Sequence, residues 1–267
     1  MTAFVKAHAY GNDFLYVPAD ALAGADLAAC ARRLCDRHRG IGADGLILYT
    51  LTDAGATMTL LNADGSVSEL SGNGLRGLAA IVARARAERG DDRRGIDVDT
   101  SAGRKHLTLE GSDGSAYLFA AAMGQPDGIH QITLEAAGER VLATVLSVGN
   151  PQCVVLGPLP DDDRFARLGP ALERHPYFPN RTNVEFVEIE SADRVRIRIW
   201  ERGVGPTESS GTGSCAAAVA AASHGGAARS LEVLAPGGAQ HVVWSDEGIT
   251  LTGWAEILAD GIYRAQL

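Results

Sequence analysis

The chain has 267 residues, which is the length of one large domain or two small ones. Its hydrophobic fraction of 46% can build a core and excludes a mostly disordered chain. The longest weakly polar stretch, residues 116–123, is far shorter than the roughly 20 residues of a membrane span. The net charge of −9 and the lack of a long Lys/Arg run argue against a nucleic-acid-binding face.

The four cysteines have neither disulfide-framework nor zinc spacing, and the seven histidines suggest no metal site. The first residues lack the basic and apolar regions of a signal peptide, so we expect a reduced, cytoplasmic protein.

Short β-like runs, separated by turn residues, outnumber helical patterns along the chain. The periodicity predicts four helices, at residues 27–36, 75–89, 160–175 and 214–223. Strands are predicted at residues 57–61, 96–98, 106–109, 116–120, 141–148, 153–156, 184–189, 195–200, 231–233, 241–244 and 249–254.

Two of the predicted helices open alike. Ser71-Gly-Asn-Gly74 leads into one helix rich in small residues, and Ser210-Gly-Thr-Gly213 leads into another. The two serines are 139 residues apart, about half the chain, which suggests two similar lobes that arose by duplication. Taken alone, either motif is also ordinary N-cap and turn chemistry.

A helix that begins in this way can bind an anion. Its first backbone N–H groups have no partner within the helix, its dipole is positive there, and glycine allows close approach. Two such helix starts aimed at one carboxylate would place Ser71 and Ser210 on opposite sides of one carbon. Two opposed groups of this kind are what a two-base racemisation needs, since one removes the α-proton and the other returns it from the opposite face.

Taken together, eight segments in order resemble the diaminopimelate epimerase family over nearly the whole chain. Any one of them alone would be a weak signal. They are residues 4–14, 35–47, 62–66, 71–76, 149–151, 181–186, 201–205 and 210–216.

The resemblance implies an α+β fold of two pseudo-symmetric lobes. Each lobe is a curved, mostly antiparallel sheet or barrel around a central helix, with the active site between the lobes. We place the N-terminal lobe at residues 1–114, joined by residues 257–267, and the C-terminal lobe at 115–256. The resemblance also implies chemistry without pyridoxal phosphate or a metal. It further implies a homodimer, because members of the family are often dimers. The sequence itself has no Walker motif and no Rossmann glycine fingerprint.

Carried over residue by residue, the resemblance assigns a complete substrate-binding set. Arg202 can form a bidentate bond with a carboxylate, and the Asn amides can donate or accept. Gly72, Asn73, Gly211 and Thr212 match the helix-end donors to the α-carboxylate. Taken alone, any single Asn is better explained as a turn or cap residue, and the set as a whole favours binding. The other members of the set are Asn12, Asn62, Asn150, Asn183 and Arg202.

The catalytic positions depart from the pattern that the resemblance implies. Ser71 and Ser210 stand where the family has cysteines, and Gln152 stands where it has a histidine, so that only Glu201 remains of four acid–base residues. A thiol titrates near 8.5 and lower at a helix N-terminus, whereas a serine hydroxyl needs an adjacent base. The remaining candidate base is Glu201, acting directly or through a serine.

Three interpretations stay open at this point. The first is an isomerase that moves a proton at the α-carbon of a diaminopimelate-like amino acid. Its variant is a divergent biosynthetic isomerase that uses Glu201, in the way that phenazine-biosynthesis isomerases of the wider superfamily use an acidic residue. The second is a catalytically impaired binding protein that keeps the ligand cleft. The third, deliberate Cys→Ser replacement, is the least favoured because Ala9 and Gln152 resemble natural drift.

Overall fold

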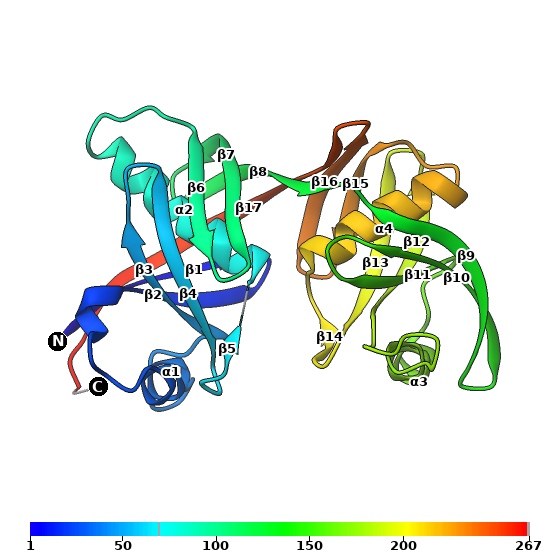
Figure 1. Cartoon of the computed structure of the whole chain (residues 1–267), viewed down its shortest axis with the longest axis horizontal. Coiled ribbons are helices and arrows are strands. Elements are labelled where there is room, and N and C mark those ends of the chain that lie inside the picture. Colours follow the sequence, from blue (N-terminus) through cyan, green and yellow to red (C-terminus); the bar gives the residue numbers. More distant parts are fainter. Residues whose placement is uncertain (69, 266–267) are drawn as a thin grey trace. The chain divides into compact units, whose positions relative to one another are not determined.

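The computed structural model describes residues 1–68 and 70–265. It divides into two compact units, one formed by Met1–Ala121 with Gly253–Leu267 and the other by Ala122–Thr252. Both units mix helices with a sheet (Figure 1), which confirms the predicted α+β class. Two long strands, β8 (Ala116–Gly124) and β17 (Gly248–Tyr263), contain the points where the chain passes from one unit to the other.

In the first unit, eight strands pair into a closed ring. Going round it, β1 pairs with β2, β2 with β3, β3 with β4, β4 with β6, β6 with β7, β7 with β8, β8 with β17, and β17 with β1. The β2–β3 and β4–β6 pairs are parallel. The bounds are β1 Thr2–Ala9, β2 Asn12–Pro18, β3 Gly45–Leu51, β4 Gly55–Asn62, β5 Val67–Ser68, β6 Gly95–Thr100 and β7 Gly103–Asp113.

The second unit repeats this order of pairing. From β9 to β17 the neighbours are β9, β10, β11, β12, β13, β15, β16 and β17, with β11–β12 and β13–β15 parallel. A short strand is added to β4 in one unit and to β13 in the other. The bounds are β9 Asp127–Ala136, β10 Glu139–Ser147, β11 Pro151–Leu156, β12 Asn183–Ser191, β13 Arg194–Glu201, β14 Gly205–Thr207, β15 Ser230–Ala235 and β16 Gly238–Ser245.

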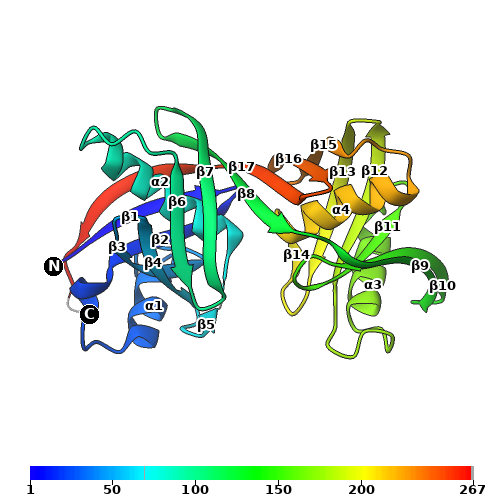
Figure 2. The same cartoon turned by 45° about the horizontal axis from the view of Figure 1, so that its top comes forward.

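Each unit encloses one helix of small residues. The helix α2 (Gly72–Ala87) contacts six strands of the first unit, and α4 (Gly211–His224) contacts six strands of the second (Figures 1 and 2). Alanine and glycine let these helices fit inside a ring of strands, because a larger side chain would overfill the space. Each helix is the centre of a large hydrophobic cluster in its own unit.

A second helix in each unit covers the outer face of the sheet. The helix α1 (Leu27–Cys35) packs on β3 and β4, and α3 (Asp162–Glu173) packs on β12, β13 and β9. Each begins at an aspartate whose carboxylate accepts a hydrogen bond from a backbone N–H, Asp26 from Ala29 and Asp161 from Arg164. Each also seals a second, smaller cluster of buried residues.

The four predicted helices are confirmed, and α2 and α4 begin three residues earlier than predicted, directly after Ser71 and Ser210. All eleven predicted strands are confirmed, mostly with longer bounds. The prediction missed β1, β2, β3, β5, β9 and β14. In β1 and β9 the side chains include Ala, Lys, His and Gln, which favour strands only weakly, so the pairing partners decide the structure there.

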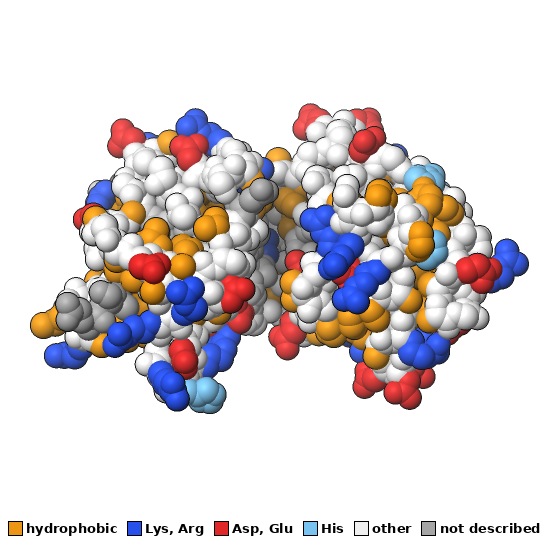
Figure 3. Space-filling view, turned by 60° about the horizontal axis from the view of Figure 1, so that its bottom comes forward, with side chains coloured by type: hydrophobic (Ala, Val, Ile, Leu, Met, Phe, Trp, Pro, Cys, Tyr) orange, Lys and Arg blue, Asp and Glu red, His pale blue; other side chains and the backbone are white. Residues whose placement is uncertain are grey.

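Within the described residues, no helix combines the length and the apolar character that crossing a bilayer requires. On the face drawn in Figure 3, basic side chains are interspersed with acidic ones in each unit.

Candidate active site

Ser71 forms the start of α2 in the first unit. It has an extended backbone (φ −128°, ψ 122°), and its hydroxyl oxygen accepts a hydrogen bond from the Gly74 N–H at 3.1 Å. This is N-cap geometry, which a serine followed by small residues favours because the cap replaces a missing intrahelical partner. Ser71 is half-buried and Gly72 is exposed, so the first N–H groups of the helix remain accessible within the unit.

Asn12 and Asn73 meet beside this helix start. The Asn73 amide donates to the Asn12 side-chain oxygen at 3.3 Å, and Asn12 donates to Asp44 at 2.8 Å. Arg37 bridges Asp44 and Asp13 with two contacts of 2.8 Å. Burial alone would raise the pKa of Asp13, but hydrogen bonds from Arg37 and Lys6 hold it below its ordinary value. These charges fix Asn12 in place.

Asn62 is placed differently. It is exposed at the end of β4, and its amide donates to the Ser66 hydroxyl at 2.9 Å across the turn that follows. In this structure Asn62 therefore acts as a turn residue, and its assignment to substrate binding stays a prediction.

The start of α4 in the second unit has the same N-cap geometry as the start of α2. Ser210 is extended (φ −145°, ψ 125°), and its hydroxyl oxygen accepts from the Gly213 N–H at 3.1 Å. Asn150 donates to the Thr212 hydroxyl at 3.3 Å, at the place where Asn12 accepts from Asn73 in the first unit. Ser210 is 8% exposed. The duplicated motif thus produces two equivalent helix starts, each with one Asn beside it.

Gln152 lies beneath the α4 start and is fully buried. With its nitrogen toward Glu185, the Gln152 amide donates to that carboxyl at 3.0 and 3.2 Å, and its oxygen side faces the Asn150 side chain at 2.6 Å and the Thr212 hydroxyl at 3.3 Å. A buried amide can hold neighbours in place through hydrogen bonds, but it does not titrate near neutral pH. The structure therefore brings Gln152, Asn150, Thr212 and Ser210 together around one helix end.

Asn183, Glu201 and Arg202 lie where β12 begins and β13 ends. The Asn183 side-chain oxygen accepts from the Arg202 backbone N–H at 2.9 Å, so Asn183 fixes the turn after Glu201. The guanidinium of Arg202 is exposed and touches the Asn180 carbonyl at 3.3 Å. Burial raises the pKa of Glu201 above its ordinary value, so this carboxyl holds a proton more readily than an exposed glutamate does.

Glu185, near the start of β12, is 0% exposed and was not among the site residues predicted from the sequence. Its carboxyl oxygens lie 3.0 and 3.2 Å from the Gln152 amide. Burial, together with the nearby Glu201, raises its pKa well above the ordinary value. The available signal was a glutamate within the apolar run 184–189, at a position where the neighbouring strands on both sides bury it.

Two of the thiols lie in the second unit near this cluster. Cys153 and Cys215 are both 0% exposed, and burial raises the pKa of Cys153 strongly. Cys215 is a buried small residue of α4. Among residues 1–68 and 70–265, no group of three or more metal-ligating side chains is arranged to hold an ion.

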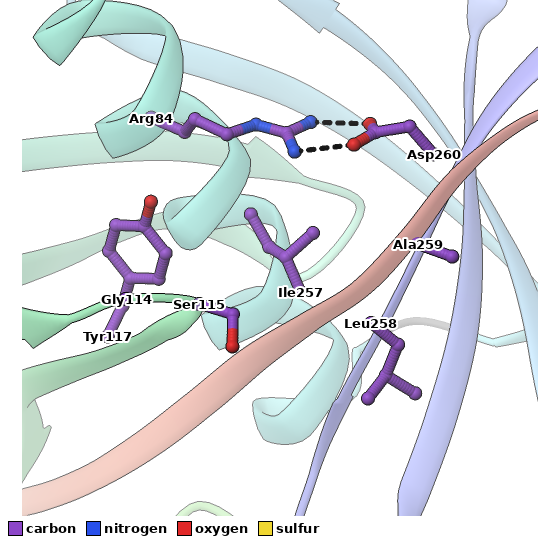
Figure 4. A pocket seen from close by; sticks show the side chains of 8 residues that line it. All are labelled: Arg84, Gly114, Ser115, Tyr117, Ile257, Leu258, Ala259 and Asp260. Atoms are coloured by element: carbon purple, nitrogen blue, oxygen red, sulfur yellow. Dashed lines mark hydrogen bonds and ion pairs between the residues drawn. The ribbon is translucent and has the colours of Figure 1, made fainter.

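The first unit also has a cavity of about 340 Å³, which lies away from the Ser71 helix start. Figure 4 shows the Arg84–Asp260 ion pair along one side of it, with Tyr117 and Ile257 lining it. Arg84 is in the last turn of α2, at the opposite end of the helix from Ser71. None of the candidate residues lines this cavity.

The chain matches the family model of diaminopimelate epimerase over residues 4–128 and 144–258. The diaminopimelate epimerase of Desulforudis audaxviator is 41% identical over 278 aligned positions, covering 97% of this chain and 98% of that protein. The enzyme of Heliobacterium modesticaldum is 40% identical, covering 94% and 95%. The chain belongs to the diaminopimelate epimerase family.

Solved structures show that the fold is shared more widely than the family sequence. A predicted epimerase of Pseudomonas aeruginosa has a TM-score of 0.71 at 15% identity and covers all of both chains. A hydroxyproline epimerase of Agrobacterium vitis has a TM-score of 0.64 at 17% identity, covering 97% of this chain and 91% of that one. At these identities the likeness shows the fold alone, and it agrees with the predicted pair of lobes, each a curved sheet around a helix.

Proposed function

We propose that this member of the diaminopimelate epimerase family inverts the α-carbon of a diaminopimelate-like amino acid by proton transfer, without pyridoxal phosphate. The observation that carries the proposal is the repeated helix start, Ser-Gly-x-Gly with an Asn beside it, in a chain of this family. Backbone N–H groups at a helix start suit a carboxylate, which every amino-acid substrate has.

We assign the α-carboxylate to the donors at Gly72, Asn73, Gly211 and Thr212. Arg202 has an exposed guanidinium that can bind a second carboxylate through two hydrogen bonds. The amides of Asn12, Asn62, Asn150 and Asn183 can take the remaining amino and carboxylate groups. A substrate with a carboxylate and an amino group at each end uses this whole set, whereas a simpler amino acid leaves part of it without a partner.

We assign the acid–base work to Glu201, with Ser71 and Ser210 as hydroxyl groups beside the reacting carbon and Gln152 as the amide that orients the second of them. Serine has no accessible anion near neutral pH, so proton transfer at this carbon needs a carboxyl. Glu201 is partly buried and has a raised pKa, which suits a group that must both take and give a proton. A homodimer in the cytoplasm is part of the same proposal, by analogy with the family.

Solvent exchange tests this function. The protein is incubated in D2O with single stereoisomers of diaminopimelate, and α-deuterium is followed by NMR while the stereoisomers are separated by chiral chromatography. The proposal predicts deuterium at the inverted carbon and formation of the second stereoisomer. Tight binding by calorimetry without any exchange would instead show a ligand-binding homologue, and would contradict the proposal.

A further inference from the structure

A buried carboxylate ends the outer helix of the second unit. Glu173, the last residue of α3, is 2% exposed. A negative charge is disfavoured at the C-terminal end of a helix and is costly to bury, so the contacts around it must offset both effects. In the first unit, α1 ends at Cys35, a buried residue whose carbonyl accepts from the Ala43 N–H at 3.1 Å, as the Glu173 carbonyl accepts from Thr182 at 3.2 Å. Closing a helix end of this kind therefore does not require a carboxylate.

Two hydrogen bonds join this carboxylate to the residues on either side of the Glu201–Arg202 pair. The Trp200 indole N–H donates to one carboxyl oxygen of Glu173 at 3.1 Å, and the Gly203 backbone N–H donates to the other at 2.9 Å. Trp200 directly precedes the pair and Gly203 directly follows it, so Glu173 fastens the chain at both ends of the turn. Because each oxygen has its own donor, an amide in place of the carboxylate would lose one of the two contacts.

The carboxyl of Glu173 is ionised at neutral pH. Arg174 and Arg181 lie 3.7 and 3.6 Å from its oxygens, and both arginine side chains are exposed. Burial alone would raise the pKa of Glu173, but the hydrogen bonds from Gly203 and Trp200, together with the two arginines, hold it below its ordinary value. Both oxygens are therefore free to accept, which the two hydrogen bonds to the turn require.

The helix α3 and the loop behind it also contact the same turn directly. A Cβ placed on Gly169 of α3 would lie 2.5 Å from the Trp200 ring, so the helix and this ring pack without spare room. The Arg202 guanidinium donates to the Asn180 carbonyl of the loop at 3.3 Å, and its backbone N–H donates to Asn183 at 2.9 Å. The conformation of the turn is thus set by groups that lie outside it.

The equivalent turn of the first unit, which follows β4, is closed from within. The Asn62 amide donates to the Ser66 hydroxyl, and the Asp64 carboxylate accepts from the N–H and the hydroxyl of Ser66. The outer helix α1 reaches this turn through the exposed Arg32, whose guanidinium is 3.4 Å from the Asp64 carbonyl. A buried carboxylate that ties the outer helix to the turn is therefore a feature of the second unit, whose turn carries an acid and a guanidinium.

We propose that Glu173 is a positioning residue, whose carboxylate fixes the turn so that Glu201 and Arg202 face the substrate together. The inference rests on the proposed function, because that function gives the proton transfer to Glu201 and the second carboxylate of the substrate to Arg202. Glu173 exchanges no proton with the substrate. It acts through the Trp200 indole and the Gly203 backbone, and it would keep the reacting carboxyl at a set distance from the group that binds the far end of the substrate.

The hold on the turn can be measured without substrate, by hydrogen exchange of the Trp200 indole N–H and the Gly203 amide in NMR spectra. The indole signal is assigned by its loss in Trp200→Phe. In Glu173→Gln only one side-chain oxygen remains to accept, so we expect at least one of the two protons to exchange about tenfold faster than in the wild type. Glu173→Asp keeps the charge but is one methylene shorter, and it should release at least one of them as well.

Glu139→Gln is the matched control for a general loosening of α3. Glu139 binds Arg164 and Arg167 of this helix at 3.0 Å each, so its loss weakens the attachment of the same helix without touching the turn. We expect both exchange rates to stay at the wild-type values in Glu139→Gln. Equal acceleration in Glu139→Gln and Glu173→Gln would overturn the inference, because any loosening of α3 would then have the same result.

The effect on Glu201 distinguishes positioning from a merely structural role. Burial raises the pKa of Glu201, so a turn that opens to water should let its carboxyl titrate at lower pH. NMR of protein labelled with ¹³C at the glutamate carboxyls measures this in the folded protein. We expect the shift in Glu173→Gln and also in the charge-preserving Glu173→Asp, and no shift in Glu139→Gln. With diaminopimelate, Glu173→Gln should raise KM and lower kcat together, so that kcat/KM for α-proton exchange falls by about 10–100-fold.

These readouts separate the inference from the proposed function. Absence of α-proton exchange in the wild-type protein would contradict the proposed function, whereas the two N–H exchange rates and the Glu201 titration would still report on Glu173. The inference is overturned if both N–H protons exchange at wild-type rates in Glu173→Gln, or if the Glu201 carboxyl titrates there as in the wild type. If Glu173→Gln does not fold, Glu173→Asp decides the question, and wild-type exchange rates in that variant contradict the inference.

Discussion

The two helix starts of this protein share their backbone but not what lies beneath it. At both, a serine accepts from a glycine N–H at 3.1 Å, and an Asn contacts the third residue of the motif at 3.3 Å. Beneath Ser71 lie Phe14 and Ile47, and beneath Ser210 lie Gln152 and Glu185. The duplicated part is the part that can hold a carboxylate, whereas what lies beneath it is apolar at Ser71 and a buried carboxyl with its amide partner at Ser210. Predictions from this difference can therefore be tested one unit against the other.

Restoring the side chains implied by the family resemblance should have the largest effect on the rate of α-proton exchange. In the triple variant Ser71→Cys, Ser210→Cys, Gln152→His, both helix starts gain a group that ionises near neutral pH, so they become chemically alike. We expect α-proton exchange to rise by about 10²–10⁴-fold, the usual contribution of a matched acid–base group. Exchange into diaminopimelate, followed by NMR, measures it. A folded triple variant that does not bind diaminopimelate would show that the assigned substrate is wrong.

The raised pKa of Glu185 predicts a stability effect confined to the second unit. The folded protein binds this proton more tightly than the unfolded chain, so the free energy of unfolding falls as pH rises from about 4.5 to the folded pKa. Below about 4.5 both states are protonated, and the contribution is fully present. Glu185→Gln should flatten the slope by up to about 1.4 kcal/mol per pH unit, and Glu188→Gln should not. Urea denaturation at several pH values measures it, and equal slopes in wild type and Glu185→Gln would contradict it.

Replacing Gly74 and Gly213, which hold the same place in the two helix starts, by alanine should change folding stability by different but smaller amounts. In Gly74→Ala the new Cβ meets the end of a flexible Ile47 side chain, which can turn away, and alanine favours the helix. In Gly213→Ala it meets the Glu185 carboxyl, which Gln152 holds in place, and also the Ser210 hydroxyl. We expect Gly213→Ala to lose about 1–3 kcal/mol of stability and Gly74→Ala less than about 1 kcal/mol. Urea midpoints compare the two, and equal losses would show that Glu185 is free to move.

The two serine N-caps should contribute equally to folding stability. Ser71→Ala and Ser210→Ala each remove one hydroxyl acceptor from the first turn of an enclosed helix, and each should cost about 1 kcal/mol of folding stability. Ser→Gly at the same positions should cost only a few tenths. A large difference between the two alanine variants in urea would mean that one serine does more for folding than cap a helix.

The sequence predicts the two helix starts because a cap needs only local residues. Ser71 and Ser210 are followed by glycines and then by small apolar residues, and that pattern fixes both the N-cap and the enclosed helix. Family resemblance adds the pair of lobes. Neither predicts the burial of Glu185, which depends on β11 and β13 pairing on either side of it. For Asn62, the family resemblance indicates substrate binding. The folded chain instead shows its amide donating to the Ser66 hydroxyl across a turn.

The most direct test of the account is α-proton exchange in D2O with diaminopimelate, comparing Glu201→Gln with Ser71→Ala. We assign the proton transfer to carboxyls and only hydrogen bonding to the first helix start. We therefore predict that exchange is lost in Glu201→Gln and persists in Ser71→Ala. Exchange that survives Glu201→Gln but disappears in Ser71→Ala would contradict this assignment.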